Sequence, residues 1–182
     1  ICPKGFSLTE TSALDLNVAI RCAADLRRVS NRKGVVQMDA NALLEIMDRI
    51  LESSRVGILA TIDRDGKPRM RWMTPTVVRG REGFLYAVTS PDFDKAVQLA
   101  EKPDVEWMIQ SKALDEILTI RGKIQMVDNP SAKSDVQEAL GGNLGTFWRI
   151  NPDETKLIVL ETVIEKLIYF KPITGEKVSV DI

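Results

Sequence analysis

Residues 56–73 read VGILATIDRDGKPRMRWM. Residues 56–62 are apolar and rich in strand-forming side chains, and the four residues that follow, Asp-Arg-Asp-Gly, have turn chemistry. Residues 67–78 fit a returning strand, in which Pro75 indicates an edge position or a bulge. The segment therefore predicts a β-hairpin.

The rest of the chain alternates short strands with helices. Further strands are expected at 84–89, 105–110, 117–127 and 157–163, with one or two more at 166–170 and 177–180. Helices are expected at 8–30, 39–53, 91–101 and 129–140. The pattern predicts a mainly β protein with flanking helices, built as a small closed or partly open β-barrel over residues 39–182. Residues 1–38 form a helical extension in this prediction.

The composition limits the possible functions. The chain has 182 residues and a net charge of −1, so it lacks the basic excess of a general nucleic-acid binder. It has no histidine, which excludes Ser-His and Cys-His nucleophilic catalysis and a histidine-ligated haem. Cysteines and carboxylates show no zinc-site spacing, so no metal site is expected.

Membrane and export signals are also missing from the pattern. No apolar run approaches the roughly 18 residues that span a bilayer, and residues 1–8 do not resemble a signal peptide. Cys2 and Cys22 do not make a disulfide framework, and Cys22 falls on the apolar stripe of the first predicted helix. We therefore expect a cytoplasmic protein that does not enter a membrane.

Two arginines and a pair of hydroxyl residues suggest an anion site. Arg69 and Arg71 alternate along the returning strand, so their side chains share a face. Thr89 and Ser90 end the next predicted strand.

A helix expected to begin at Pro91 would add free N–H groups and a partial positive charge, with Lys95 just inside it. If Arg69 or Arg71 reaches these groups, the site has the charge that a phosphate monoester requires. The alternative is that both arginines are solvated and that Lys95 pairs with Asp92 or Asp94 on the helix surface.

Two segments resemble one known family. GILATIDRDGKPRMRW, residues 57–72, looks like the opening hairpin of the pyridoxamine 5′-phosphate oxidase-like, FMN-binding split-barrel proteins. TSPDFDKAVQLAEKPDVEW, residues 89–107, resembles the segment that follows this hairpin in the family, and Gly122 lies where these proteins commonly have glycine. The similarity covers residues 44–160. It implies a split barrel that forms a homodimer and holds FMN between its subunits.

The resemblance assigns seven residues to the cofactor. They are Arg69, Met70, Arg71, Trp72, Thr89, Ser90 and Lys95. By this resemblance Arg69 and Lys95 contact the phosphate, and residues 70–72 lie along the flavin ring or the ribityl chain. Trp148, which follows a glycine-rich loop, is a candidate for stacking on the flavin, although a tryptophan in a barrel is more often a core residue.

Four positions depart from the pattern of true pyridoxamine phosphate oxidases. Phe93 and Asp94 stand where those enzymes tend to have Ser and Arg, Thr74 replaces a substrate lysine, and Ile117 replaces a glutamine that meets the flavin. The C-terminal Arg-and-His substrate motif has no counterpart. The sequence therefore favours a general-stress-type relative over a true oxidase.

The functional prediction is an FMN-dependent oxidoreductase whose small-molecule substrate and electron donor are unknown. In such a protein the flavin supplies the chemistry, and the chain supplies binding and orientation. No catalytic acid or base is named. The alternatives are a non-catalytic flavin-binding sensor, a relative that binds the deazaflavin F420, and a barrel that has lost its cofactor.

Overall fold

The computed structural model describes residues 38–145, 149 and 157–182. The predicted helix over residues 8–30, the two cysteines and Trp148 lie outside the described residues. No helix within the described part of the chain is both long enough and apolar enough to cross a membrane.

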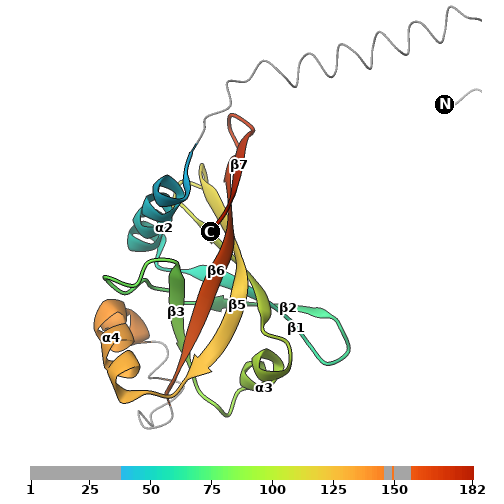
Figure 1. The fold of residues 1–182 in the computed structure, drawn as a ribbon, viewed down its shortest axis with the longest axis vertical. Helices are drawn as coiled ribbons and strands as arrows, with labels where there is room; N and C mark the ends of the chain where they lie inside the picture. Colours follow the sequence, from blue (N-terminus) through green and yellow to red (C-terminus); the bar gives the residue numbers. More distant parts are fainter. Residues whose placement is uncertain (1–37, 146–148, 150–156) are drawn as a thin grey trace, which may run out of the picture. The chain divides into compact units, whose positions relative to one another are not determined.

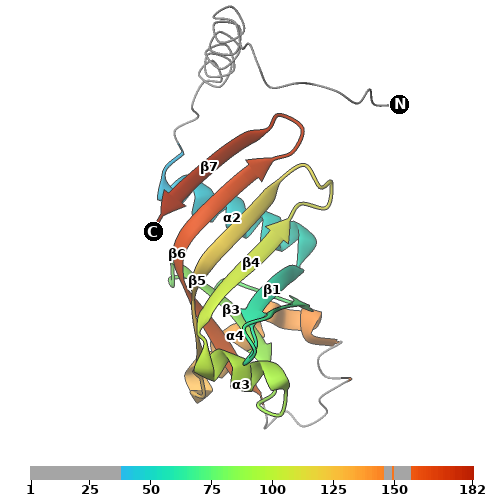
Figure 2. The ribbon, with the colours of Figure 1, turned by 90° about the vertical axis from the view of Figure 1, so that its right-hand side faces the viewer.

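A seven-stranded antiparallel sheet forms the centre of residues 38–182 (Figures 1 and 2). Its strands are β1 (Gly57–Ile62), β2 (Pro68–Met73), β3 (Phe84–Thr89), β4 (Asp104–Gln110), β5 (Ile117–Val127), β6 (Ile158–Lys171) and β7 (Glu176–Asp181). Neighbouring strands follow the order β2-β1-β4-β5-β6-β3, and β7 also pairs with β6. The predicted hairpin is confirmed: β1 pairs with β2, and Ile62 lies opposite Pro68.

Three α-helices of the described residues pack on this sheet. They are α2 (Ala40–Ser54), α3 (Asp94–Glu101) and α4 (Pro130–Leu140), and a short 3₁₀ turn, η1 (Gly141–Leu144), follows α4. The Asp39 carboxylate caps α2 by accepting from the backbone N–H of Ala42 at 2.8 Å. Helix α2 packs on β4 and β6, α3 on β1 and β5, and α4 on β3 and β6.

Two predicted strand limits are wrong. The returning strand β2 ends at Met73, because Pro75 cannot donate to a ladder, and pairing resumes only at an isolated bridge between Thr76 and Tyr86. The segments predicted at 157–163 and 166–170 are one continuous strand, β6. Glu165 is the extra residue of a bulge in β6, because the consecutive β5 residues Arg121 and Gly122 lie opposite Lys166 and Ile164, and this bulge absorbs the change of register between the two halves.

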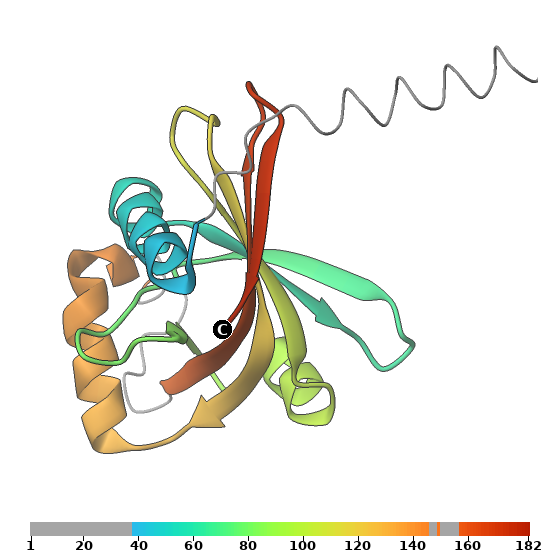
Figure 3. The same cartoon turned by 45° about the horizontal axis from the view of Figure 1, so that its top comes forward.

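The barrel is split rather than closed. Among the described residues, β2 and β3 are joined only near the Thr76–Tyr86 bridge, so the β1–β2 hairpin projects away from α2 and α4 (Figures 1 and 3). This confirms the predicted split-barrel fold and leaves β2 at an edge of the sheet.

The main core lies between α2, α3 and the concave side of the sheet. Trp107 is fully buried there, and its Nε1–H donates to Thr162 Oγ1 at 3.1 Å, so this tryptophan is a core residue and not a flavin platform. Gly122 lies where β5 crosses β6 so closely that a Cβ atom would sit 2.0 Å from the carbonyl oxygen of Val163. The glycine expected from the family pattern is therefore required by the packing of these two strands.

Candidate functional site

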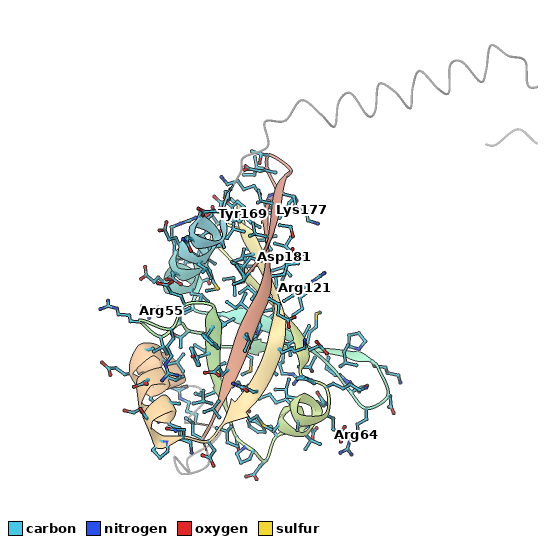
Figure 4. The ribbon with its side chains drawn as sticks, viewed as in Figure 1. Arg55, Arg64, Arg121, Tyr169, Lys177 and Asp181 are labelled. Atoms are coloured by element: carbon cyan, nitrogen blue, oxygen red, sulfur yellow. The ribbon has the colours of Figure 1, made fainter. Side chains whose placement is uncertain are left out.

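A cavity of about 710 Å³ lies between the β1–β2 hairpin and helix α3. Charged and polar side chains line much of it: Asp63, Arg69, Arg71, Asp94, Lys95 and Gln98. Arg64 marks its outer end, where the hairpin turn reaches α3 (Figure 4). The Arg64 guanidinium forms a salt bridge to Glu101 at 2.8 Å, so the turn is tied to the helix.

The register of the hairpin directs both arginines of β2 into this cavity. Leu59 lies opposite Arg71, and Thr61 opposite Arg69. Directly paired residues point to the same face of a sheet, and both β1 residues are buried on the face that packs toward α3. The predicted shared face of Arg69 and Arg71 is thus confirmed.

Arg71 is held firmly but is incompletely paired. Its Nη2 donates to Thr61 Oγ1 and to Gln98 Oε1, each at 3.0 Å. Its Nη1 is buried and has no hydrogen-bond partner among the described residues. Burial, followed by the charge of Arg69, lowers the pKa of the side chain, and the charge of Asp94 opposes this shift. A buried guanidinium N–H without an acceptor is costly, so this nitrogen fits a ligand that brings an anionic oxygen.

Arg69 differs because a carboxylate already holds it. Its Nε donates to Asp63 Oδ2 at 2.9 Å, and its side chain is 59% exposed. Asp63 also accepts from the backbone N–H of Lys67 at 2.8 Å, and these two contacts keep the pKa of the Asp63 carboxyl below its usual value. The charge of Arg69 is therefore partly compensated within the chain.

Lys95 contributes a second basic group. Its Nζ lies 4.3 Å from the centre of the Phe93 ring, and burial, followed by the charge of Arg71, lowers its pKa to about 8. Within the described part of the chain it forms no salt bridge with Asp92 or Asp94, so the alternative surface pairing is wrong.

The remaining hydroxyl residues lie elsewhere. Helix α3 begins at Asp94 rather than at Pro91, because residues 90–93 form a turn in which the Phe93 N–H donates to the Ser90 carbonyl at 3.3 Å. Ser90 Oγ accepts from the Asp92 N–H, also at 3.3 Å, which stabilises that turn. Thr89 and Ser90 are buried and are not among the cavity-lining residues. The structure thus separates them from the three basic residues.

Met70 and Trp72 point to the other face of β2. Their side chains are 74% and 81% exposed, beside Ala60 and Ile58 of β1. Large apolar side chains at this exposure on an edge strand are unusual for a surface in contact with water alone.

Sequence reasoning did not single out Thr61 and Gln98. The hairpin register places Thr61 opposite Arg69, and Gln98 lies three residues after Lys95, on the same side of α3. The hairpin register and the three-residue separation from Lys95 could both be read from the sequence. Only the packing of α3 on β1 shows that the side chains of Thr61 and Gln98 contact Arg71.

A family model described as pyridoxamine 5′-phosphate oxidase matches residues 43–170. A comparison with curated proteins finds no match. Solved structures show the same fold. One is a Clostridium acetobutylicum protein related to general stress protein 26, with a TM-score of 0.63 and 15% identity, covering 80% of this chain and 97% of that one.

Two other structures also share the fold. A putative pyridoxamine 5′-phosphate oxidase from Listeria innocua has a TM-score of 0.55 and 24% identity, covering 69% of this chain and 95% of that one. A structure titled F420 reductase has a TM-score of 0.53 and 17% identity, covering 66% of this chain and 94% of that one.

Proposed function

The chain belongs to the pyridoxamine 5′-phosphate oxidase family, and from that membership we propose that it binds FMN beside helix α3 and acts as an oxidoreductase. FMN, when bound, supplies hydride or electron transfer. The residues of the cavity bind and orient it.

The observation that carries the proposal is the buried Nη1 of Arg71 beside the ammonium group of Lys95, neither of which has a hydrogen-bond or salt-bridge partner within the part of the chain that the structure describes. A phosphate monoester carries a charge of about −1.5 to −2 at neutral pH and offers three strong acceptor oxygens. It would satisfy the Arg71 nitrogen and offset both cations in one step. In this proposal Arg71 and Lys95 bind the phosphate directly, and Arg69 contributes from the rim of the cavity.

A homodimer is part of the same proposal. Met70 and Trp72 expose apolar surface on the face of β2 that turns away from the cavity. A second copy covering this face would remove that surface from water. Strand β2 lies at an edge of the sheet, so a cofactor whose phosphate lies in the cavity would extend along that edge, where the backbone of residues 70–72 would border the flavin ring or the ribityl chain, as the family resemblance implies.

A deazaflavin is the second candidate cofactor. One structure of the same fold is titled F420 reductase, and a phosphate group of either cofactor would suit the two cations. We place FMN first because its terminal phosphate monoester can match the positive charges of both Arg71 and Lys95.

The test is the visible absorbance of the purified protein, recorded with and without added FMN. A flavin spectrum that persists through desalting, at about one FMN per chain, supports the proposal. Reduction of that flavin by NADH or NADPH would then separate an oxidoreductase from a non-catalytic sensor. A colourless protein that retains F420 would favour the second cofactor, and one that retains neither would indicate a barrel without a cofactor.

A further inference from the structure

Three elements of the fold meet at the guanidinium of Arg71. Thr61 comes from β1, Arg71 from β2 and Gln98 from α3. Arg71 Nη2 donates to both Thr61 Oγ1 and Gln98 Oε1 at 3.0 Å, and Thr61 Oγ1 lies 3.2 Å from the same Gln98 oxygen. The three polar groups form a closed set of contacts around one nitrogen.

We infer that Thr61 and Gln98 are positioning residues, which fix Arg71 so that its Nη1 faces the phosphate of the bound cofactor. The inference rests on the proposed function for the identity of that ligand. A guanidinium is planar, so two acceptors on Nη2 restrict the plane and thereby the direction of Nη1. The ligand then meets an arginine whose side-chain entropy has already been lost on folding.

The chemistry of the two holding groups supports this role. Both are neutral, so they orient Arg71 and leave its positive charge available. Arg69 provides the contrast on the same strand face, since the carboxylate of Asp63 holds it and offsets its charge. A hydroxyl and an amide are the side-chain groups that can hold a cation without neutralising it.

The burial of Thr61 adds a second observation. Its side chain is 1% exposed on a strand whose other inward residues are apolar, so a valine of nearly the same shape would fill the position. The hydroxyl makes its hydrogen bonds only to Gln98 and Arg71 within the described residues. The Thr61 hydroxyl therefore acts only on Arg71 and Gln98 within the described residues.

The first experiment measures FMN affinity by fluorescence quenching in four variants. Thr61→Val and Gln98→Leu are expected to weaken binding about tenfold each, the cost of losing one contact to a charged group. Thr61→Ser restores the hydroxyl and should restore affinity. Gln98→Glu should weaken binding as well, because it keeps an acceptor but offsets the charge of Arg71. Gln137→Leu on α4 lies outside the cavity and serves as the control.

A double-mutant cycle tests whether the effect passes through Arg71. In an Arg71→Met background, Thr61→Val and Gln98→Leu should cause no further loss of FMN affinity. An equal loss in both backgrounds would overturn the inference, as would wild-type affinity in both single variants. Riboflavin, which lacks the phosphate, should bind the single variants and the wild type alike.

A second readout needs no cofactor. In the unliganded protein, NMR of the arginine side chains should show slow rotation of the Arg71 guanidinium in the wild type and Thr61→Ser, and fast rotation in Thr61→Val and Gln98→Leu. Unchanged rotation in those two variants contradicts the positioning role. A wild-type protein that binds no FMN contradicts the proposed function instead, while this spectrum still decides whether Thr61 and Gln98 hold Arg71.

Discussion

Arg71 and Lys95 face one cavity with like charge, and the charge of Arg71 is, after burial, the second cause that lowers the Lys95 pKa to about 8. Two half-buried cations repel each other and lose hydration, so the arrangement costs stability unless an anion joins them. Binding sites commonly contain such perturbed groups. Four predictions concern this cavity and the sheet around it, and a fifth concerns the outer face of β2.

The affinity for FMN should depend on pH through Lys95. A bound phosphate stabilises the ammonium form and raises the Lys95 pKa above its unliganded value of about 8. Affinity should therefore be steady between about pH 6.5 and 7.5, where the phosphate is mostly doubly charged, and fall about tenfold as the pH rises from the unliganded to the liganded pKa of Lys95. Titrations across this range test the prediction. Lys95→Met should bind more weakly at neutral pH and lose the dependence, and riboflavin should show little of it with the wild type.

Removing the Lys95 charge should stabilise the unliganded protein. The folded-state pKa of about 8 lies below the ordinary value of 10.5, so folding disfavours the protonated form of Lys95. This destabilisation is fully present below pH 8 and disappears as the pH rises above 10.5. Because the side chain is only about half buried, the gain for Lys95→Met at neutral pH is reduced by solvent screening to about 1 kcal/mol. Urea unfolding without cofactor measures it. A Lys95→Met protein less stable than the wild type at pH 7 would contradict the unpaired, desolvated state of this lysine.

Arg71 should matter more to FMN binding than Arg69. The family resemblance gives the phosphate to Arg69, but Asp63 already pairs with that side chain, whereas the buried Nη1 of Arg71 has no partner among the residues that the structure describes. Arg71→Met should weaken FMN binding by about 2 kcal/mol, and Arg69→Met by less than about 1 kcal/mol, as for an exposed ion pair. The double variant Lys95→Ala, Arg69→Ala should lose more than about 2 kcal/mol of FMN-binding free energy only if both residues contact the phosphate. Equal losses in the two single arginine variants would return the main role to Arg69.

The sequence predicted the elements of the fold well because their signals are local. The Asp63–Gly66 turn defined the first hairpin, Asp39 capped α2, and strand β5 has the predicted bounds. It did not predict that residues 158–171 form one strand, because the two halves are joined by a bulge at Glu165, which shows only in the pairing with Arg121 and Gly122 of β5. It also began α3 three residues early, because the turn after Ser90 uses backbone contacts that propensity does not reveal.

Only the part of the site that depends on local sequence signals was predicted. Arg69 and Arg71 were placed on one face of β2 because alternate residues of a strand point to the same side, and this inference needs no knowledge of the packing. Thr61 and Gln98 come from separate elements, and their contact with Arg71 depends on how α3 packs against β1. Charge patterns in a sequence do not show which cation a neighbour has already neutralised, and that distinction separates Arg69 from Arg71.

Gly122 should not tolerate a side chain. A Cβ atom there would lie 2.0 Å from the Val163 carbonyl oxygen, which is backbone and cannot move aside without breaking the β5–β6 pairing. Gly122→Ala should lower the free energy of unfolding by about 2–4 kcal/mol. Gly142→Ala is the matched control, since a Cβ at that position meets no atom of the described residues within 4 Å. Chemical denaturation of both variants gives the comparison. A Gly122→Ala protein as stable as the control would show that the strands can separate at the bulge at little cost.

The exposed face of β2 should be covered by a second copy of the chain. Trp72 is 81% exposed and lies beside Met70, and aromatic residues at this exposure are enriched where protein surfaces meet. Trp72→Ser should weaken self-association about tenfold or more, as measured by sedimentation equilibrium. Ile173→Ser is the control, because Ile173 is 85% exposed at the β6–β7 turn and belongs to no proposed interface.

The same substitution links assembly to the cofactor. If the second copy borders the flavin, Trp72→Ser should bind FMN more weakly at low protein concentration and regain part of its affinity as concentration rises, because mass action restores the dimer. The Trp72 variant should leave the unfolding free energy of the isolated chain nearly unchanged, since the side chain is exposed there. Self-association equal to that of Ile173→Ser would exclude this face of β2 as the dimer interface. An intact dimer with weakened FMN binding would instead assign Trp72 to the flavin alone.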